Sequence, residues 1–169
     1  MSKSRLHELS EHGVSVWVDS LSREWLETGE LKRDLAGKLA KEGHEVLDLG
    51  THTSAAVDYP DYAEAVAEVL REGQAERGVI VCGSGAGVSI AASKFPGIRA
   101  AVAHDVYTAH QAVEHDDMNV LCLGSRVVGQ ALAREIVDAF VGARFSGEER
   151  HLRRLAKIHD FEVRFSGKV

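Results

Sequence analysis

Cys82 stands at the start of a glycine-rich stretch that could carry chemistry. An apolar run, Gly78–Cys82, leads into Gly83-Ser84-Gly85-Ala86-Gly87. The alternating glycines let backbone N–H groups converge on an anion where a helix begins, and a thiol facing the positive end of that helix is favoured as the thiolate. Such a thiolate can accept a proton or attack carbon. Taken alone, the same residues also fit a tight turn after a buried strand that ends in a small apolar cysteine, which is the role we expect for Cys122.

A second group of residues is basic and lies late in the chain. Arg126 follows the fifth apolar run, and Arg150, His151, Arg153 and Arg154 open the last predicted helix. Arg150 and Arg154 are four residues apart and share a helix face, and His151 neighbours that face. With Arg126 they predict a clamp for a phosphate group. The alternative is an ordinary solvated helix surface.

Histidines beside carboxylates form a third group. His115-Asp116 precedes the fifth apolar run, and His104-Asp105 follows the fourth. A histidine held by a carboxylate can move protons near neutral pH. A metal site made of His104, His110 and His115 lacks a recognised ligand spacing, so we favour surface histidines and predict no metal.

Apolar runs alternate with amphipathic stretches along the chain. Strands are predicted at residues 14–18, 45–49, 78–82, 99–103 and 119–123. Helices are predicted at 31–39, 62–70, 107–114, 130–140 and 148–159, and a further helix of small residues runs from the glycine-rich stretch through Ala92. This alternation predicts an α/β fold with a parallel sheet covered on both faces. Ligands of such sheets bind beyond the carboxyl ends of the strands, at loops that start here at Asp19, Gly50, Cys82, His104 and Gly124. We expect the cysteine, His115 and the arginines to lie on these loops or at their edge.

Size and charge set limits on function. The chain has 169 residues, 44% of them apolar, and a formal net charge of −6. We expect one domain over residues 14–160, a polar lead-in at 1–13 and a tail at 161–169. The negative charge argues against nucleic acid or an anionic membrane as a partner, and no apolar stretch is long enough to span a bilayer. Two distant cysteines without Cys-x-x-Cys spacing favour a reducing, cytoplasmic location.

Five stretches together resemble one enzyme family. They are Asp58-Tyr59-Pro60, residues 80–92, residues 94–100, residues 119–127, and Arg150-His151 with Arg154. In these stretches the chain is similar to the ribose-5-phosphate isomerase B family, which includes allose-6-phosphate and galactose-6-phosphate isomerases. The resemblance covers about residues 14–159. It implies a Rossmann-like, three-layer α/β/α sandwich with a five-stranded parallel sheet.

The resemblance also implies a reaction and an assembly. The reaction is aldose–ketose isomerisation of a sugar phosphate through an enediolate, without cofactor or metal. The assembly is a homodimer or a dimer of dimers, with active sites at the subunit interface. The implied roles are a base for Cys82, sugar holding for Ser84, enediolate stabilisation for the amides of Gly83, Gly85, Ala86 and Gly87, ring opening for His115, phosphate binding for Arg126, Arg150, His151 and Arg154, and sugar lining for Asp19, Tyr59 and Asp116.

Two positions depart from the family pattern where the sugar is held. Ser20 follows Asp19 in place of the usual histidine, and Asp116 replaces an asparagine. A tetrose phosphate, which cannot form the usual ring, would need no ring opening, and Trp25 could fill the vacated space. The alternatives are a non-catalytic phosphosugar- or nucleotide-binding module on the same fold, and a cysteine redox or hydrolytic enzyme.

Overall fold

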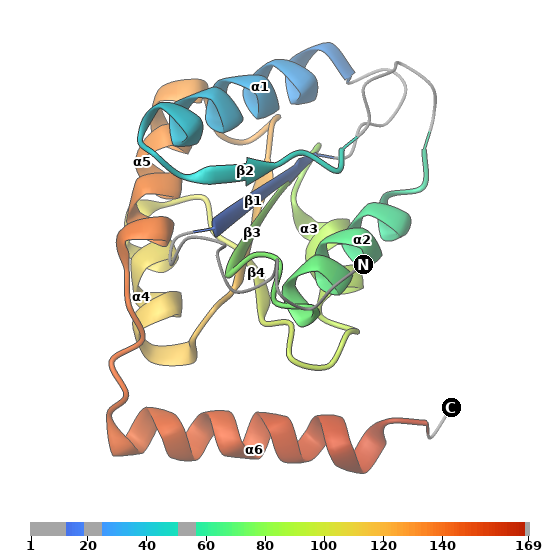
Figure 1. Cartoon of the computed structure of the whole chain (residues 1–169), viewed down its shortest axis with the longest axis vertical. Coiled ribbons are helices and arrows are strands. Elements are labelled where there is room, and N and C mark those ends of the chain that lie inside the picture. The colour runs from blue at the N-terminus through green and yellow to red at the C-terminus, as the bar shows by residue number, and fades with distance from the viewer. Residues whose placement is uncertain (1–12, 19–24, 51–56, 168–169) are drawn as a thin grey trace, which may run out of the picture.

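The computed structural model describes residues 13–18, 25–50 and 57–167, with the side chains of 29–50 and 57–167 (Figure 1). Strands and helices alternate through most of this part of the chain. Their bounds are β1 Gly13–Val18, α1 Trp25–Lys41, β2 Glu45–Leu47, α2 Tyr59–Arg71, β3 Arg77–Cys82, α3 Ala86–Ala92, β4 Ala100–Val102, α4 Val106–Asp116, β5 Val120–Gly124, α5 Gln130–Gly142 and α6 Glu149–Phe165.

The five strands form one sheet in the order β2-β1-β3-β5-β4, and every neighbouring pair is parallel. In the pair of central strands, Gly78 lies opposite Val120 and Cys82 opposite Gly124. The ends of β3 and β5 are therefore level, and the loops after Cys82 and Gly124 leave the sheet side by side. The predicted α/β fold with a parallel sheet is confirmed.

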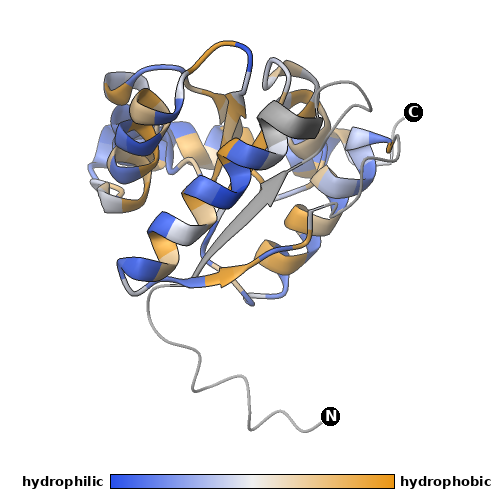
Figure 2. Cartoon of the chain, turned by 90° about the horizontal axis from the view of Figure 1, so that it is seen from above, coloured by the Kyte–Doolittle hydropathy of each residue, from blue (hydrophilic) through white to orange (hydrophobic). Residues whose placement is uncertain are grey.

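Helices cover both faces of the sheet, and each face has its own apolar core (Figure 1). On one face Leu35 and Leu39 of α1 pack with Phe140 of α5 and with residues of α4. On the other face Val66 of α2 packs with Val88 of α3 and with the strands. The hydrophilic and hydrophobic turns along α1 in Figure 2 reflect its position between core and solvent. The result is a three-layer α/β/α sandwich.

The last helix lies apart from this sandwich. In Figure 1, α6 runs beneath the β4 side of the sheet, from the α4 side towards the α3 side. Glu162 accepts a hydrogen bond from the Gly97 N–H at 3.1 Å, which ties the second half of α6 to the loop before β4.

The helix α6 also extends further than the sequence predicts. We expected a tail from residue 161, but α6 continues through Phe161 to Phe165. Helical spacing of apolar and charged residues persists to this point, and the first residue with a left-handed backbone is Gly167, with φ of +75°. At the other end Gly13 opens β1 rather than closing a lead-in, and residues 1–12 lie outside the described part.

Of the helices that the structure describes, none is both long enough and apolar enough to cross a bilayer.

Candidate functional site

The loop between β3 and α3 surrounds the thiol of Cys82. Cys82 is 9% exposed at the carboxyl end of β3, and the Gly85 N–H donates a hydrogen bond to its Sγ at 3.1 Å. Gly85 has a φ of +80°, a left-handed conformation that disfavours other residues, and a Cβ there would lie 3.2 Å from the Leu123 carbonyl carbon. The Gly85 N–H is therefore held against the sulfur by a backbone conformation that only glycine adopts easily.

A second backbone amide of this loop also forms a hydrogen bond within the loop. The Ala86 N–H donates to Ser84 Oγ at 3.3 Å. A Cβ on Gly124 would lie 2.8 Å from the Ser84 carbonyl carbon, so the end of β5 packs directly against the loop backbone. Within residues 83–87, which we expected to hold a substrate oxygen, the amides of Gly85 and Ala86 thus already have partners in the loop.

Two further predicted residues lie at this loop. A Cβ on Gly87 would lie 3.0 Å from Cζ of Tyr59, so the absence of a side chain there lets the tyrosine ring rest on the helix start. The Arg126 N–H donates to the Gly83 carbonyl at 3.2 Å, which fixes the backbone of Arg126 beside the cysteine loop. We call the region formed by Tyr59, residues 82–87 and Arg126 the thiol edge.

The pair His104-Asp105 stabilises structure at the same end of the sheet. His104 Nε2 accepts a hydrogen bond from the Gly124 N–H at 2.9 Å, which requires the ring to be unprotonated at that nitrogen. Asp105 caps α4 by accepting hydrogen bonds from the N–H and Oγ1 of Thr108, both at 2.7 Å, and these bonds lower the pKa of its carboxyl. The proton-moving role considered for His104 has no support in this geometry.

A different set of predicted residues meets where α4 ends and α6 begins. The ring of His115, in the last turn of α4, lies with its centroid 4.3 Å from that of His151, at an interplanar angle of 34°. The Nδ1 of His115 is 3.1 Å from Nε2 of Gln111, one helix turn earlier. We call this region, with Asp116, Ser146, Arg150 and Arg154, the imidazole corner.

His151 is the buried member of the imidazole corner. It is 1% exposed, its Nδ1 lies 2.7 Å from Ser146 Oγ, and its Nε2 is buried without a hydrogen-bond partner among the described residues. Burial is the main cause that lowers the pKa of His151, followed by the neighbouring charges of His115 and Arg150. The ring is therefore held neutral.

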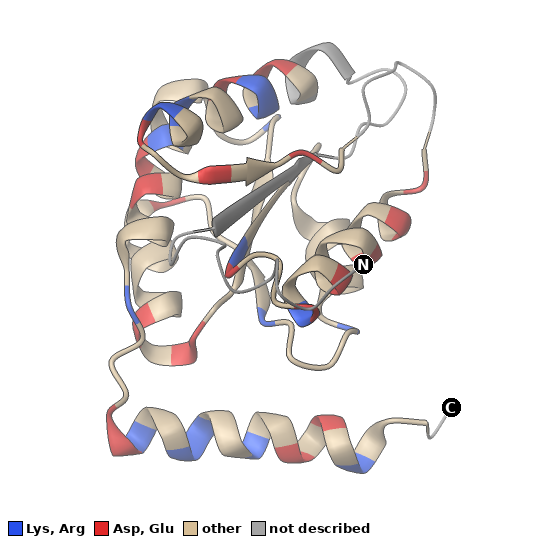
Figure 3. Ribbon diagram, in the orientation of Figure 1, with Lys and Arg blue, Asp and Glu red and all other residues tan. Residues whose placement is uncertain are grey.

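The arginines of α6 face outward, unlike His151. Arg150 and Arg154 are exposed, and Arg150 Nε pairs with Glu148 at 2.8 Å. Figure 3 shows basic residues recurring along α6 after its acidic start. The sequence placed His151 next to the arginine face, but α6 turns its ring into the protein, so His151 does not share a surface with them. Asp116 is exposed at the end of α4.

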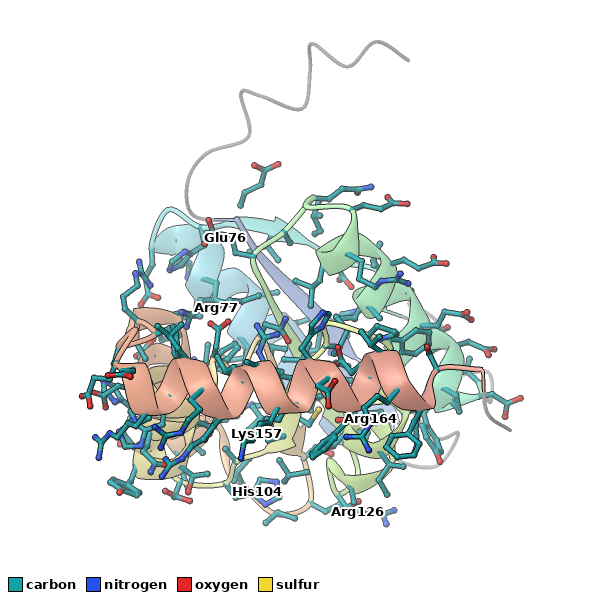
Figure 4. The ribbon with its side chains drawn as sticks, turned by 90° about the horizontal axis from the view of Figure 1, so that it is seen from below. Glu76, Arg77, His104, Arg126, Lys157 and Arg164 are labelled. Atoms are coloured by element: carbon teal, nitrogen blue, oxygen red, sulfur yellow. The ribbon has the colours of Figure 1, made fainter. Side chains whose placement is uncertain are left out.

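The two regions lie at opposite ends of the strands within one chain. Cys82 is level with Gly124 at the end of β5, whereas His115 lies before β5 begins. The five residues of β5 span roughly 13 Å at about 3.3 Å per residue. Figure 4 shows the same separation between Arg77 at the start of β3 and His104 and Arg126 beyond the ends of β4 and β5.

This separation corrects one expectation from the sequence. We expected His115 and the arginines to lie on the loops that follow strands or at their edge, together with Cys82. Of the arginines, Arg126 does so, in the loop after β5. The connection that carries His115 enters a parallel strand and therefore lies at its amino end. Asp19, which we expected to line the sugar, falls outside the described residues.

Sequence reasoning missed several residues that support the site. Gly124 is needed for the approach of Ser84, and Gln111 and Ser146 contact the two imidazoles. The spacing of Gln111 four residues before His115 is a readable helical signal, but the link from Ser146 to His151 depends on a loop conformation. Cys122 is a buried core residue, and burial raises the pKa of its thiol well above the usual range.

In the part of the chain that the structure describes, no three His, Cys, Asp or Glu side chains gather in an arrangement that could hold a metal ion.

Comparison with known proteins gives a consistent result. The Ribose/Galactose Isomerase family profile matches residues 27–158. Ribose-5-phosphate isomerase B of Escherichia coli is 46% identical over 134 residues, 79% of this chain and 89% of that protein. A galactose-6-phosphate isomerase subunit of Clostridium acetobutylicum is 40% identical over 116 residues, 69% of this chain and 67% of that subunit.

Solved structures agree with the sequence comparison. The ribose-5-phosphate isomerase B of Clostridium thermocellum superposes with a TM-score of 0.82 at 45% identity, covering 90% of this chain and 99% of that one. A likeness of this extent in both sequence and fold goes beyond a shared architecture. The chain therefore belongs to the ribose/galactose isomerase family, a family of sugar-phosphate isomerases.

Proposed function

We propose that this protein interconverts an aldose phosphate and a ketose phosphate, of the ribose 5-phosphate and ribulose 5-phosphate type, with Cys82 as the base. The single observation that carries the proposal is the 3.1 Å hydrogen bond from the Gly85 N–H to Cys82 Sγ. It places a backbone N–H donor on Sγ at the carboxyl end of a strand, the end of a parallel sheet where ligands bind, and this supports a role for the thiol as the base. No cofactor or metal takes part in this scheme.

The chemistry needs one proton to move between adjacent carbons. The Cys82 thiolate removes the proton from C2 of the open-chain aldose, and the electron pair forms the C1–C2 double bond of an enediolate. The former carbonyl oxygen on C1 gains a proton, the hydroxyl on C2 loses one, and the thiol returns its proton to C1. Backbone amides of residues 83–87 other than those of Gly85 and Ala86, together with the Ser84 hydroxyl, stabilise the charge that develops on oxygen.

The imidazole corner supplies the remaining groups from a second copy of the chain. His115 opens the ring of a pentose or hexose phosphate, a step that a tetrose phosphate does not need, and Arg150 and Arg154 bind the phosphate together with Arg126. Asp116, Tyr59 and Asp19 line the sugar. Two observations support this arrangement: the length of β5 separates His115 from Cys82 within one chain, and α6 carries exposed apolar residues beyond the corner, with Val163 62% exposed. A homodimer, or a dimer of dimers, joins both regions across an interface and buries this surface.

The physiological sugar follows from the two departures from the family pattern. Ser20 lacks the ring nitrogen of a histidine, and the exposed carboxylate of Asp116 adds negative charge where the sugar is held. We propose a substrate that needs less help with ring opening, such as a tetrose phosphate. An assay panel of erythrose 4-phosphate, ribose 5-phosphate, allose 6-phosphate and galactose 6-phosphate tests this, and clear preference for ribose 5-phosphate contradicts it.

Location and other partners follow from composition. The chain carries a net charge of −6, and Cys82 and Cys122 are both free thiols. We propose a cytoplasmic enzyme without nucleic-acid or membrane partners, because a reducing compartment keeps such thiols free and an acidic surface repels polyanions.

A mixing experiment tests the shared site. One variant carries Cys82→Ser, and the other carries both Arg150→Gln and Arg154→Gln. Each is assayed alone below the KM of the wild type, and then after joint unfolding and refolding. If sites combine both chains, half of the dimers are mixed and each has one intact site, so about one quarter of wild-type activity returns. No recovery from correctly dimeric mixtures contradicts the shared site.

If no sugar phosphate turns over but one raises the melting temperature, the chain is a binding module instead.

A further inference from the structure

The scheme above gives no role to the buried ring of His151. The position of that ring does not fit the phosphate-binding role that the family resemblance implies. It is 1% exposed, so it offers no surface to a phosphate that the exposed Arg150 and Arg154 would bind. It is also the buried residue of α6, the side chain through which the first turn of that helix enters the protein. Packing alone does not call for an imidazole here, because Nε2 is buried without a partner in the described residues.

A closed set of contacts holds this ring against His115. The Ser146 N–H donates to the Glu114 carbonyl at 3.0 Å, which fixes Ser146 to the residue preceding His115. Ser146 Oγ lies 2.7 Å from His151 Nδ1, and the His151 ring lies 4.3 Å from the ring of His115. The two imidazoles are thus connected twice, once by ring contact and once through Ser146 and the backbone of α4.

We propose that His151 is a positioning residue that orients the His115 imidazole, and that it does not bind the substrate phosphate. This inference rests on the proposed function, in which His115 opens the sugar ring. A neutral ring beneath His115 fixes the plane of that imidazole without adding a charge. Burial lowers the pKa of His151, which agrees with the neutral state.

Charged groups around the pair come from both helices and the segment that joins them. Glu114 Oε2 lies 3.9 Å from His115 Nε2 and 3.7 Å from His110 Nδ1, and Glu148 pairs with Arg150. Arg154 contributes a further positive charge near His151. Gln111 faces Nδ1 of His115 and Glu114 faces its Nε2, so the orientation that His151 sets decides which nitrogen meets which group.

The test separates positioning from phosphate binding. His151→Leu removes the hydrogen bond to Ser146 and the ring contact, and His151→Asn keeps a polar atom for Ser146 without a ring. With ribose 5-phosphate as substrate, we expect His151→Leu to lower kcat about tenfold and to leave KM and the inhibition constant of inorganic phosphate within about twofold. We expect His151→Asn to fall between wild type and His151→Leu. A raised KM and weaker phosphate inhibition at unchanged kcat would overturn the proposal.

A second readout does not depend on turnover. Imidazole ¹⁵N and ¹H resonances of His115 are compared in wild type, His151→Leu, His151→Asn and the control Arg153→Gln. We expect the His115 signals to shift and broaden in the two His151 variants and to stay unchanged in the control. Unchanged His115 signals in a folded His151→Leu would overturn the proposal even if the protein isomerises no sugar, and shifted signals without any isomerase activity would indicate that the proposed function has failed instead.

Discussion

The thiol edge depends on contacts of backbone groups, whereas the imidazole corner depends on contacts between side chains. At the thiol edge most contacts involve the backbone: the Gly85 amide contacts Cys82 Sγ, and Gly87 and Gly124 leave room for close neighbours. At the imidazole corner side chains meet one another, with His115, His151 and Ser146 contributed by three separate segments. Larger side chains are poorly tolerated where a site is formed by closely packed backbone. A site formed by side chains depends instead on the packing of the helices that carry them.

The largest effect should come from the thiol itself. Cys82→Ser keeps the size of the side chain but replaces the proposed base by a hydroxyl that is not a base near neutral pH. We expect kcat to fall about 10²–10⁴-fold, the usual contribution of a general base. Cys122→Ala is the matched control, since Cys122 is fully buried and its raised pKa keeps it a thiol, and it should keep activity within about twofold. Activity in Cys82→Ser would remove Cys82 from the mechanism.

The backbone packing of the thiol edge is tested next by Gly124→Ala. The new Cβ would lie 2.8 Å from the Ser84 carbonyl carbon, and that backbone cannot move aside without displacing the cysteine loop. We expect a loss of about 1–3 kcal/mol in the free energy of unfolding. We also expect kcat to fall by more than a smaller folded fraction would explain. Urea unfolding and steady-state kinetics measure the two effects. Unchanged kinetics in this variant would mean that the loop geometry does not matter for turnover.

A smaller effect is expected from pH at the imidazole corner. The pKa of His151 lies below its unfolded value of 6.5, so folding disfavours protonation. Its contribution to stability is complete above pH 6.5 and is lost as pH falls from there through the folded pKa. In His151→Leu the melting temperature should decline less steeply between pH 7 and pH 5 than in the wild type. Parallel curves for the two proteins would contradict a buried neutral His151.

The smallest effect is expected outside both regions. Gly37 lies within α1, is exposed, and a Cβ there meets no atom within 4 Å. Gly37→Ala should therefore raise the free energy of unfolding by about 0.5–1 kcal/mol through backbone entropy, with kinetics unchanged. This variant calibrates Gly124→Ala, because both add the same methyl group and differ in whether space exists for it. A loss of stability in Gly37→Ala would show that the calibration fails.

How far the sequence could predict each region follows from this difference. The thiol edge is largely one contiguous run, and the strand before it and the helix after it set the position of Cys82. His115 precedes a strand, and in a parallel sheet this already indicates the amino end, a signal that we did not use. The inward turn of His151 has no such local signal, since its helical spacing from Arg150 and Arg154 fits either face.

The sequence by itself determined the α/β alternation, the parallel sheet, the place of Cys82 at a strand end and the family resemblance, because each depends on periodicity or on neighbouring residues. Only the tertiary structure decided that His151 is buried beneath His115 and that Ser146 contacts it. These outcomes depend on how α6 is rotated against α4 and on the hydrogen bonds of Ser146. Contacts between segments distant in sequence, which no local pattern encodes, determine both.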